Sequence, residues 1–196
     1  MSKISLEPNA SGAGTFTLAA PNSNTNRTLN LPDESGVLFS DGSGVPGSAV
    51  TGQLASSNMP AGSVIQVVSK IFSDTTVTTS SSYVDVTNSN FSIIPSSASS
   101  KILVLYSLVY RFRPDGGSQT SFAKIVRNDS VDVWESEFLS INLDRLTISL
   151  VMQYLDSPAT ISSVTYKAQT RMSRGTNIVV NDNTADSSIT LMEIAG

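Results

Sequence analysis

The sequence predicts an all-β protein, an antiparallel β-sandwich of jelly-roll type that follows an N-terminal arm. Three observations predict this fold class. Charged residues are only 14% of the chain, and much of the remaining polarity comes from Ser, Thr and Asn, which suit strands and turns and disfavour helix interiors. Apolar and polar residues alternate in many short runs. These runs recur at the ~8–12-residue spacing of a sandwich or barrel, and about eight strands are expected.

Residues 1–40 are predicted to form a β-hairpin arm, because TFTLAA and RTLNLP alternate and are separated by the polar loop NSNTN. An isolated two-stranded unit is marginal in water. We therefore expect the arm to dock on sister subunits, on a capsid shell or on both, by adding a strand to a sheet edge. The residues predicted to dock are Phe16, Leu18, Arg27, Leu29, Leu31, Val37, Leu38 and Phe39.

Residues 41–62 are rich in Gly, Ser and Pro and predict a linker, and residues 63–196 are predicted to form the sandwich knob. A turn signal at residues 128–130 predicts a hairpin. At most a turn or two of helix is expected, within residues 136–145. The strands predicted in order are residues 63–72, 82–94, 101–113, 121–129, 131–138, 145–155, 161–172, 177–180 and 188–196.

The clearest strand signal is residues 101–113, KILVLYSLVYRFR. Its even-numbered residues from 102 to 112 are all apolar and share one face of a strand. The other face is also apolar through Leu103, Leu105 and Val109. A strand that is apolar on both faces is typically covered on both. We therefore expect a second sheet on one face and another body, for example a neighbouring subunit, on the other.

The composition argues against several functional classes. The chain has no Cys and no His, which removes thiolate nucleophiles, His bases and the commonest zinc ligands. The net charge is −4, and the 12 Lys and Arg residues do not cluster, which argues against nucleic-acid and membrane-surface binding. The N-terminal residues lack the apolar core of a signal peptide. No phosphate loop or nucleophile elbow occurs, so we expect no enzyme, no metal and no cofactor.

Three weaker constellations have ordinary structural explanations. Carboxylates that surround Trp134, above all Glu135 and Glu137, could serve glycoside cleavage, or the ring could stack on a sugar. Strand edges commonly carry such charges against aggregation. Asn and Asp in residues 181–186 could bind Ca²⁺, but an Asn/Asp turn is the simpler interpretation. Arg111 and Arg113, near Asp115, are expected to be solvated or paired across the sheet.

The segment FTLAAPNSNTNRTLNLPDESGVLFS resembles a module of tail fibres and other virion appendages of tailed bacteriophages. The matching core is residues 27–33 with 36–38. Residues 59–69, 92–110 and 189–196 are similar to segments of the distal domains of such fibres, in the same order. The resemblance implies a homotrimeric, non-enzymatic virion protein at the virion surface. A single copy of the module, without a long shaft, fits a capsid decoration (cement) protein or a head fibre better than a long tail fibre.

The expected function is therefore a trimeric structural protein that decorates or stabilises the capsid, with the major capsid protein, or tail or fibre components, as partners. The alternative is a tail-fibre receptor-binding protein that attaches to host surface glycans. Aromatic platforms with polar rims suit sugars. The candidate glycan contacts are Trp134, Glu135 and Glu137, with Tyr106 and Tyr110 as further aromatic platforms.

Overall fold

The computed structural model describes residues 11–14, 24–26, 58–113, 119–140, 146–182 and 185–196. The chain divides into two units, Met1–Gly47 and Ser48–Gly196. The predicted hairpin of the arm, its docking residues and most of the predicted linker lie outside the described residues. The description below therefore concerns the second unit.

The described part of this unit contains eleven strands and no α-helix. Their bounds are β1 Val64–Phe72, β2 Thr76–Thr78, β3 Val84–Asp85, β4 Phe91–Ile93, β5 Lys101–Arg113, β6 Gln119–Arg127, β7 Val131–Ser140, β8 Leu146–Asp156, β9 Val164–Arg174, β10 Asn177–Val180 and β11 Ser187–Ile194.

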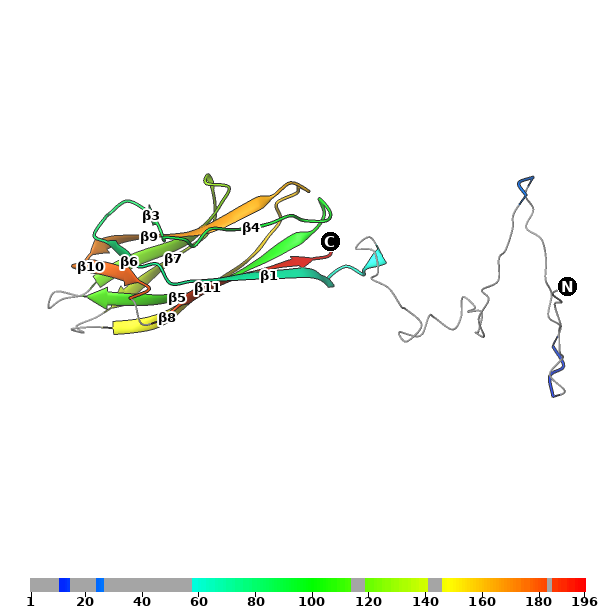
Figure 1. Cartoon of the computed structure of the whole chain (residues 1–196), viewed down its shortest axis with the longest axis horizontal. Helices are drawn as coiled ribbons and strands as arrows, with labels where there is room; N and C mark the ends of the chain where they lie inside the picture. Colours follow the sequence, from blue (N-terminus) through cyan, green and yellow to red (C-terminus); the bar gives the residue numbers. More distant parts are fainter. Residues whose placement is uncertain (1–10, 15–23, 27–57, 114–118, 141–145, 183–184) are drawn as a thin grey trace. The chain divides into compact units, whose positions relative to one another are not determined.

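These strands form two antiparallel sheets that face each other (Figure 1). In sheet A, β5 pairs with β8 on one side and with β10 and β11 on the other, and these pair with β2 and β1. In sheet B the order is β3 and β4, then β9, β6 and β7. If β1 with β2, β3 with β4, and β10 with β11 are each counted as one strand, the sandwich has eight strands. Numbered in chain order, these eight lie in the order 1-8-3-6 in sheet A and 2-7-4-5 in sheet B. This is the jelly-roll arrangement, so the predicted fold class is confirmed.

The core lies between the sheets and is centred on β5. The even-numbered side chains of this strand, from Ile102 to Phe112, are at most 1% exposed, which confirms the predicted inner face. Ile125 of β6 and Val164 and Tyr166 of β9 close the core from sheet B. Strand alternation thus places one complete apolar face against the other sheet.

The hairpin predicted at residues 128–130 is also confirmed. Asn128 and Asp129 have φ values of 48° and 62°, and they join β6 to β7. Two successive residues with positive φ characterise the turn that matches the twist of a two-stranded ribbon, and Asn and Asp tolerate this conformation better than other side chains.

One expectation about secondary structure was wrong. The single strand expected over residues 82–94 is divided into β3 and β4, because the chain turns at Asn88, whose φ is 57°. The strand predicted over residues 131–138 is confirmed as β7, which continues through residues 139–140, so that part of the segment that allowed at most a turn or two of helix is extended; residues 141–145 lie outside the described part. In addition, β2 was not predicted, because its three residues, Thr-Val-Thr, are too few to show an alternation.

Candidate functional site

The outer side of sheet A is almost free of charge, and we call it the uncharged face. Its side chains alternate with the buried ones, and the register places them in rows across four strands. It comprises Val67, Ser69 and Ile71 in β1, Ser188, Thr190, Met192 and Ile194 in β11, Leu103, Leu105, Ser107 and Val109 in β5, and Thr147, Ser149, Val151, Gln153 and Leu155 in β8.

Large apolar side chains of the uncharged face are open to solvent. Ile71 is 71% exposed, Val151 61% and Val67 54%. One row of the face, Val67, Met192, Leu103 and Leu155, is apolar throughout, whereas Ser188 and Ser107 lie between Ile71 and Val151. Apolar side chains that gather in this way on an exposed face commonly mark sites of protein association. The surface on which we expect a second body, the outer side of β5, is therefore part of the uncharged face.

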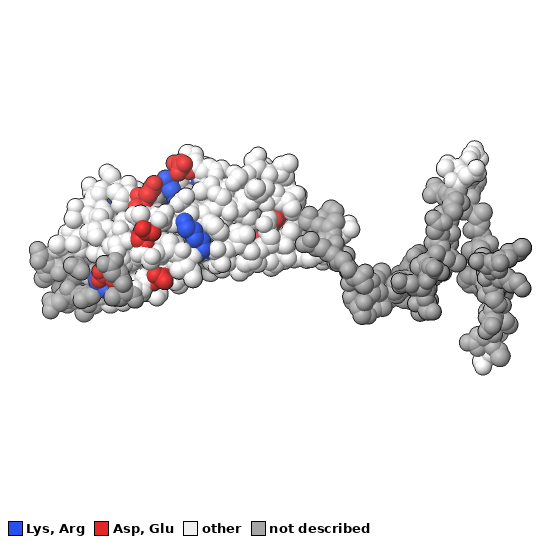
Figure 2. Space-filling view, in the orientation of Figure 1, with Lys and Arg blue, Asp and Glu red and all other residues white. Residues whose placement is uncertain are grey.

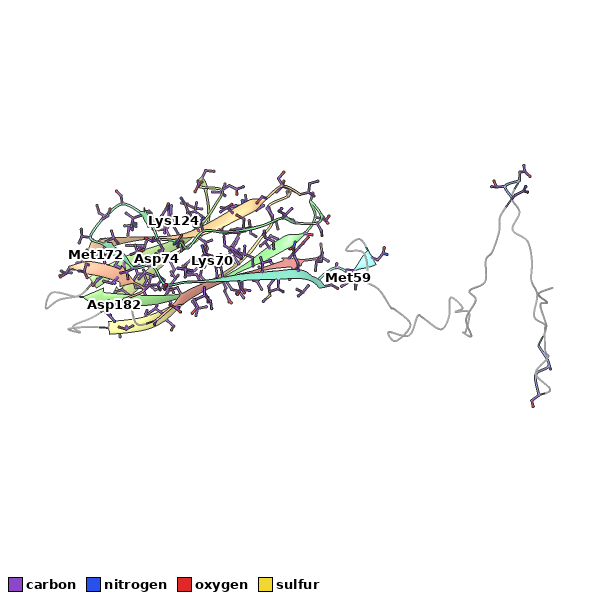
Figure 3. All side chains as sticks on the ribbon, viewed as in Figure 1. Met59, Lys70, Asp74, Lys124, Met172 and Asp182 are labelled. Carbon is purple, nitrogen blue, oxygen red and sulfur yellow. The ribbon has the colours of Figure 1, made fainter. Side chains whose placement is uncertain are left out.

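The charged residues near this face lie at its two ends. Lys101, the first residue of β5, is exposed at one end. At the other end Arg111 is only 5% exposed and forms an ion pair with Asp182. Asp182 lies at the end of the sandwich opposite Met59 (Figure 3). Of the two alternatives expected for Arg111, solvation or pairing, the structure shows pairing, with a partner that sequence spacing did not suggest.

The outer side of sheet B differs because it carries charges of both signs. Lys124 Nζ lies 2.7 Å from Asp132, and Lys167 Nζ lies 2.9 Å from Asp85 and 2.7 Å from Asp129. The two lysine side chains are 12% and 15% exposed, whereas the three carboxylates are 53–82% exposed. The cations thus lie beneath a layer of carboxylates. In the view of Figure 2, charged side chains are few and most of the described surface is uncharged.

Tyr83 is at the centre of an aromatic and cationic cluster on sheet B. Lys124 Nζ lies 4.3 Å from the centre of its ring, and the guanidinium of Arg171 lies 5.1 Å from it. The Tyr83 hydroxyl donates a hydrogen bond to Glu135. Burial, together with this bond, raises the pKa of Tyr83 to about 12. Cation–π contacts and the hydrogen bond therefore fix the segment before β3 on the sheet.

A polar pocket of about 300 Å³ opens beside the outer side of sheet B. It is lined by residues 85–90 with Asp129, Thr165 and Lys167. Its carboxylates already bind Lys167, and Gln169 Nε2 donates to Asp85 at 2.6 Å. Among the described residues, no aromatic side chain lines the pocket. The described residues also contain no cluster of His, Cys, Asp or Glu suited to a metal ion, and no helix among them could span a membrane.

A buried ion pair links the two sheets. Asp156, the last residue of β8, is 6% exposed and accepts two hydrogen bonds from Arg127 Nη1, at 2.8 and 2.7 Å. The hydroxyl of Tyr166 in β9 donates to the same carboxylate at 2.7 Å. Burial, and then the bond to Asp156, raises the pKa of Tyr166. The tyrosine therefore remains a neutral donor, and β6, β8 and β9 are tied together.

A second buried carboxylate lies near the last residues of the chain. Glu193 is 0% exposed and accepts hydrogen bonds from Gln66 Nε2 at 2.6 Å and from the backbone N–H and hydroxyl of Ser96, both at 2.7 Å. Burial on its own raises the pKa of Glu193, but the bonds from Gln66 and Ser96 outweigh it, so the pKa is lowered from 4.5. The carboxylate thus joins β11 to β1 and to the loop after β4.

Replacing Glu193 by Gln is expected to lower the free energy of unfolding by about 1–2 kcal/mol at pH 7, because hydrogen bonds to a charged acceptor are lost. A lowered pKa in the folded state gives stability that is complete above about pH 4.5 and is lost as pH falls through the folded pKa. The difference between wild type and variant should therefore narrow in acid. Urea unfolding at pH 7 and pH 4 measures it, and a difference that does not change with pH would contradict the prediction.

The structure does not bring the predicted glycan contacts together. Trp134 packs against the core, whereas Glu135 and Glu137 point outward and are exposed. Val133 has no partner in β6, because Ile125 pairs with Trp134 and Val126 with Asp132. This bulge is a local insertion that strand alternation does not reveal. Asp132 consequently reaches the outer side, where it binds Lys124.

Tyr106 and Tyr110, the further aromatic platforms, are 1% and 0% exposed. The expectation that they contact a glycan was wrong, because both rings fill the core and their hydroxyls bond to Ser89 O and to Thr170. Conversely, two aromatic residues that the sequence did not single out, Tyr83 and Phe122, lie among the charged side chains of sheet B; the guanidinium of Arg171 is 3.7 Å from the centre of the Phe122 ring.

No protein family matches the sequence, and no curated protein matches it. Among solved structures, the VP2 subviral particle of infectious bursal disease virus is 13% identical, with a TM-score of 0.27 over 67% of this chain and 38% of that chain. Dimeric latent PorU from Porphyromonas gingivalis is 12% identical, with a TM-score of 0.32 over 73% of this chain and 14% of that chain. The chain thus spans well under half the length of these proteins, and similarity this low carries no functional argument.

Proposed function

We propose that this chain is a non-enzymatic structural protein of a bacteriophage virion, a homotrimer that decorates or stabilises the capsid surface as a cement protein or short head fibre. The observation that carries the proposal is the uncharged face of sheet A. Three of its large apolar residues, Val67, Ile71 and Val151, are more than half exposed in the single chain. The virion setting rests on the resemblance of the N-terminal and distal segments to phage appendages.

Association through the uncharged face is favourable for a simple energetic reason. Fully burying one Val or Ile side chain contributes about 1.5–3 kcal/mol. Burying a charge costs several kcal/mol unless it is paired. Between Lys101 and the Arg111–Asp182 pair, the described strands place no charged side chain on this face. Copies of the chain can therefore cover it without that cost.

Deleting residues 1–40 is expected to leave a folded trimer that no longer binds capsids, because the proposal assigns docking to the arm and assembly to the sandwich. Sedimentation equilibrium gives the mass of the full chain and of the truncated chain. Cosedimentation with capsids that lack the protein gives binding. A truncated trimer that still saturates these capsids would contradict the docking role, and a monomeric full chain would contradict the trimer.

The alternative, attachment to host surface glycans, has less support. The polar pocket beside sheet B offers carboxylates and amides to a sugar, but its carboxylates are already engaged by Lys167 and Gln169. Its lining also lacks the aromatic surface on which sugars commonly stack. Capsid decoration therefore remains the proposed function.

A further inference from the structure

Three charged residues are buried in the described part of the sandwich, and only two of them have an ionic partner there. Arg111 pairs with Asp182, and Asp156 pairs with Arg127. Glu193 is 0% exposed and is held by neutral donors, and no Lys or Arg among the described residues forms an ion pair with it. Because buried charges are generally paired or bound to a metal, Glu193 is the exception that needs an explanation.

The hydrogen bonds of Glu193 leave one of its acceptor positions open. An ionised carboxylate has about four lone-pair positions, shared equally by its two oxygens. The backbone N–H and the hydroxyl of Ser96 both donate to Oε1, and Gln66 Nε2 donates to Oε2. Oε2 can therefore take one further contact, from a hydrogen-bond donor or from a cation.

A cavity of about 320 Å³ lies beside the groups that bind this carboxylate, at the end of the sandwich where β1 begins (Figure 3). It is lined by the four serines of residues 96–100, by Ala195 and Gly196, and by Met59 and Ile65. Glu193 is not part of the lining, but Ser96, which donates twice to its Oε1, is. Because a water molecule takes up about 30 Å³ in the liquid, the cavity has room for an ion with several waters.

The hydroxyl of Ser100 is the second unusual group at this cavity. Ser100 lines the cavity and is 2% exposed, and its Oγ has no hydrogen-bond partner of good geometry among the described residues. It lies close enough to Glu193 to help lower the pKa of that carboxyl. Unpaired buried polar groups are rare in native proteins and commonly mark a bound water or ion. The cavity therefore has an unsatisfied oxygen in its wall and an uncompensated negative charge behind it.

We propose that this cavity binds a hard metal cation, with the carboxylate of Glu193, the hydroxyl of Ser100 and water as ligands. Hard cations such as Ca²⁺ take oxygen ligands of these kinds. A water molecule alone could pair with Ser100, but it would leave the charge of Glu193 uncompensated, whereas a cation satisfies both groups. Because the site has one carboxylate rather than a cluster of them, we expect weak binding, with a dissociation constant of about 0.1–1 mM. This inference does not depend on the proposed trimer.

The cation would act where the predicted linker enters the sandwich. The Ala195 N–H donates to Ser63 O, and the Gly62 N–H donates to Ala195 O, both at 2.8 Å. Ala195 follows Glu193 by two residues, and Glu193 joins β11 to β1 and to the loop after β4. A cation bound to Glu193 therefore stabilises the end of β11 that holds the residues leading into β1.

Thermal unfolding of the full chain, treated with EDTA and dialysed into a tetramethylammonium salt, tests this proposal. NaCl, KCl, MgCl2 or CaCl2 is then added at constant ionic strength. With the dissociation constant given above, about 10 mM of the cation that binds should raise Tm by about 3–10 °C. The variants E193Q and S100A should lose this rise. E137Q is the matched control, because Glu137 is exposed in β7 of sheet B, and it should keep the rise.

Two results would overturn the proposal. A wild-type Tm that none of these cations changes would show that the cavity holds water only. A rise retained in E193Q or in S100A would show that the cation binds elsewhere, for example among the exposed carboxylates of sheet B. The rise is measured within each protein, so a lower starting stability of E193Q does not obscure it. If E193Q does not fold, S100A decides, because removing an unpaired buried hydroxyl is not expected to destabilise the chain.

Discussion

Replacing Asp156 by Ala should destabilise the sandwich by about 2 kcal/mol or more, because Arg127, only 20% exposed, would lose the charged acceptor of its hydrogen bonds. Arg127 would lose both of its hydrogen bonds to this carboxylate, and the Tyr166 hydroxyl would lose its acceptor. These three residues come from β8, β6 and β9, so the loss affects the connection between the sheets. Urea unfolding at pH 7, with all variants at one protein concentration, measures the change.

Asp132→Ala is the matched control for this prediction. Asp132 also pairs with a cation, Lys124, at 2.7 Å, but its side chain is 53% exposed. Exposed ion pairs contribute about 0–1 kcal/mol, so the control should unfold close to the wild type. Similar losses in the two variants would show that burial does not distinguish the pairs, and the assigned cross-sheet role of Asp156 would be incorrect.

The sequence predicted features that depend on neighbouring residues. The alternation of β5 identified its bounds and its inner face, since six apolar residues at even positions leave one arrangement that buries them. Asn128 and Asp129 identified the hairpin, because they are suited to positive φ. The apolar outer residues of β5 predict a second body over this sheet, and that prediction stays untested; the structure shows that this side carries exposed apolar residues.

Features that depend on distant residues could not be predicted in the same way. The pairs Arg127–Asp156 and Gln66–Glu193 join strands far apart in the chain, and only the order of strands in the sheets brings them together. The side of the sheet on which Asp132 lies depends on one unpaired residue, Val133. The position of β8 at the edge of sheet A likewise follows only from the order of the strands in the sheet.

Replacing Ile71 by Lys is expected to convert the trimer into single chains. Ile71 is 71% exposed in the single sandwich, so lysine should leave the core intact and change the stability of one chain by no more than about 0.5 kcal/mol. In the proposed trimer another copy covers the uncharged face, which includes this position. Three lysines would then be buried in each trimer, at a cost of several kcal/mol per charge.

Sedimentation velocity over a range of protein concentrations measures this change, and far-UV circular dichroism confirms that the strands persist. Ile161→Lys is the control, since Ile161 is 64% exposed and lies between β8 and β9, outside the strands of the uncharged face. The control should sediment as a trimer. An Ile71→Lys protein that remains trimeric at the same concentrations would show that β1 is not at the interface. If β1 were there, three unpaired charges would be buried between the copies and would lower their affinity for one another.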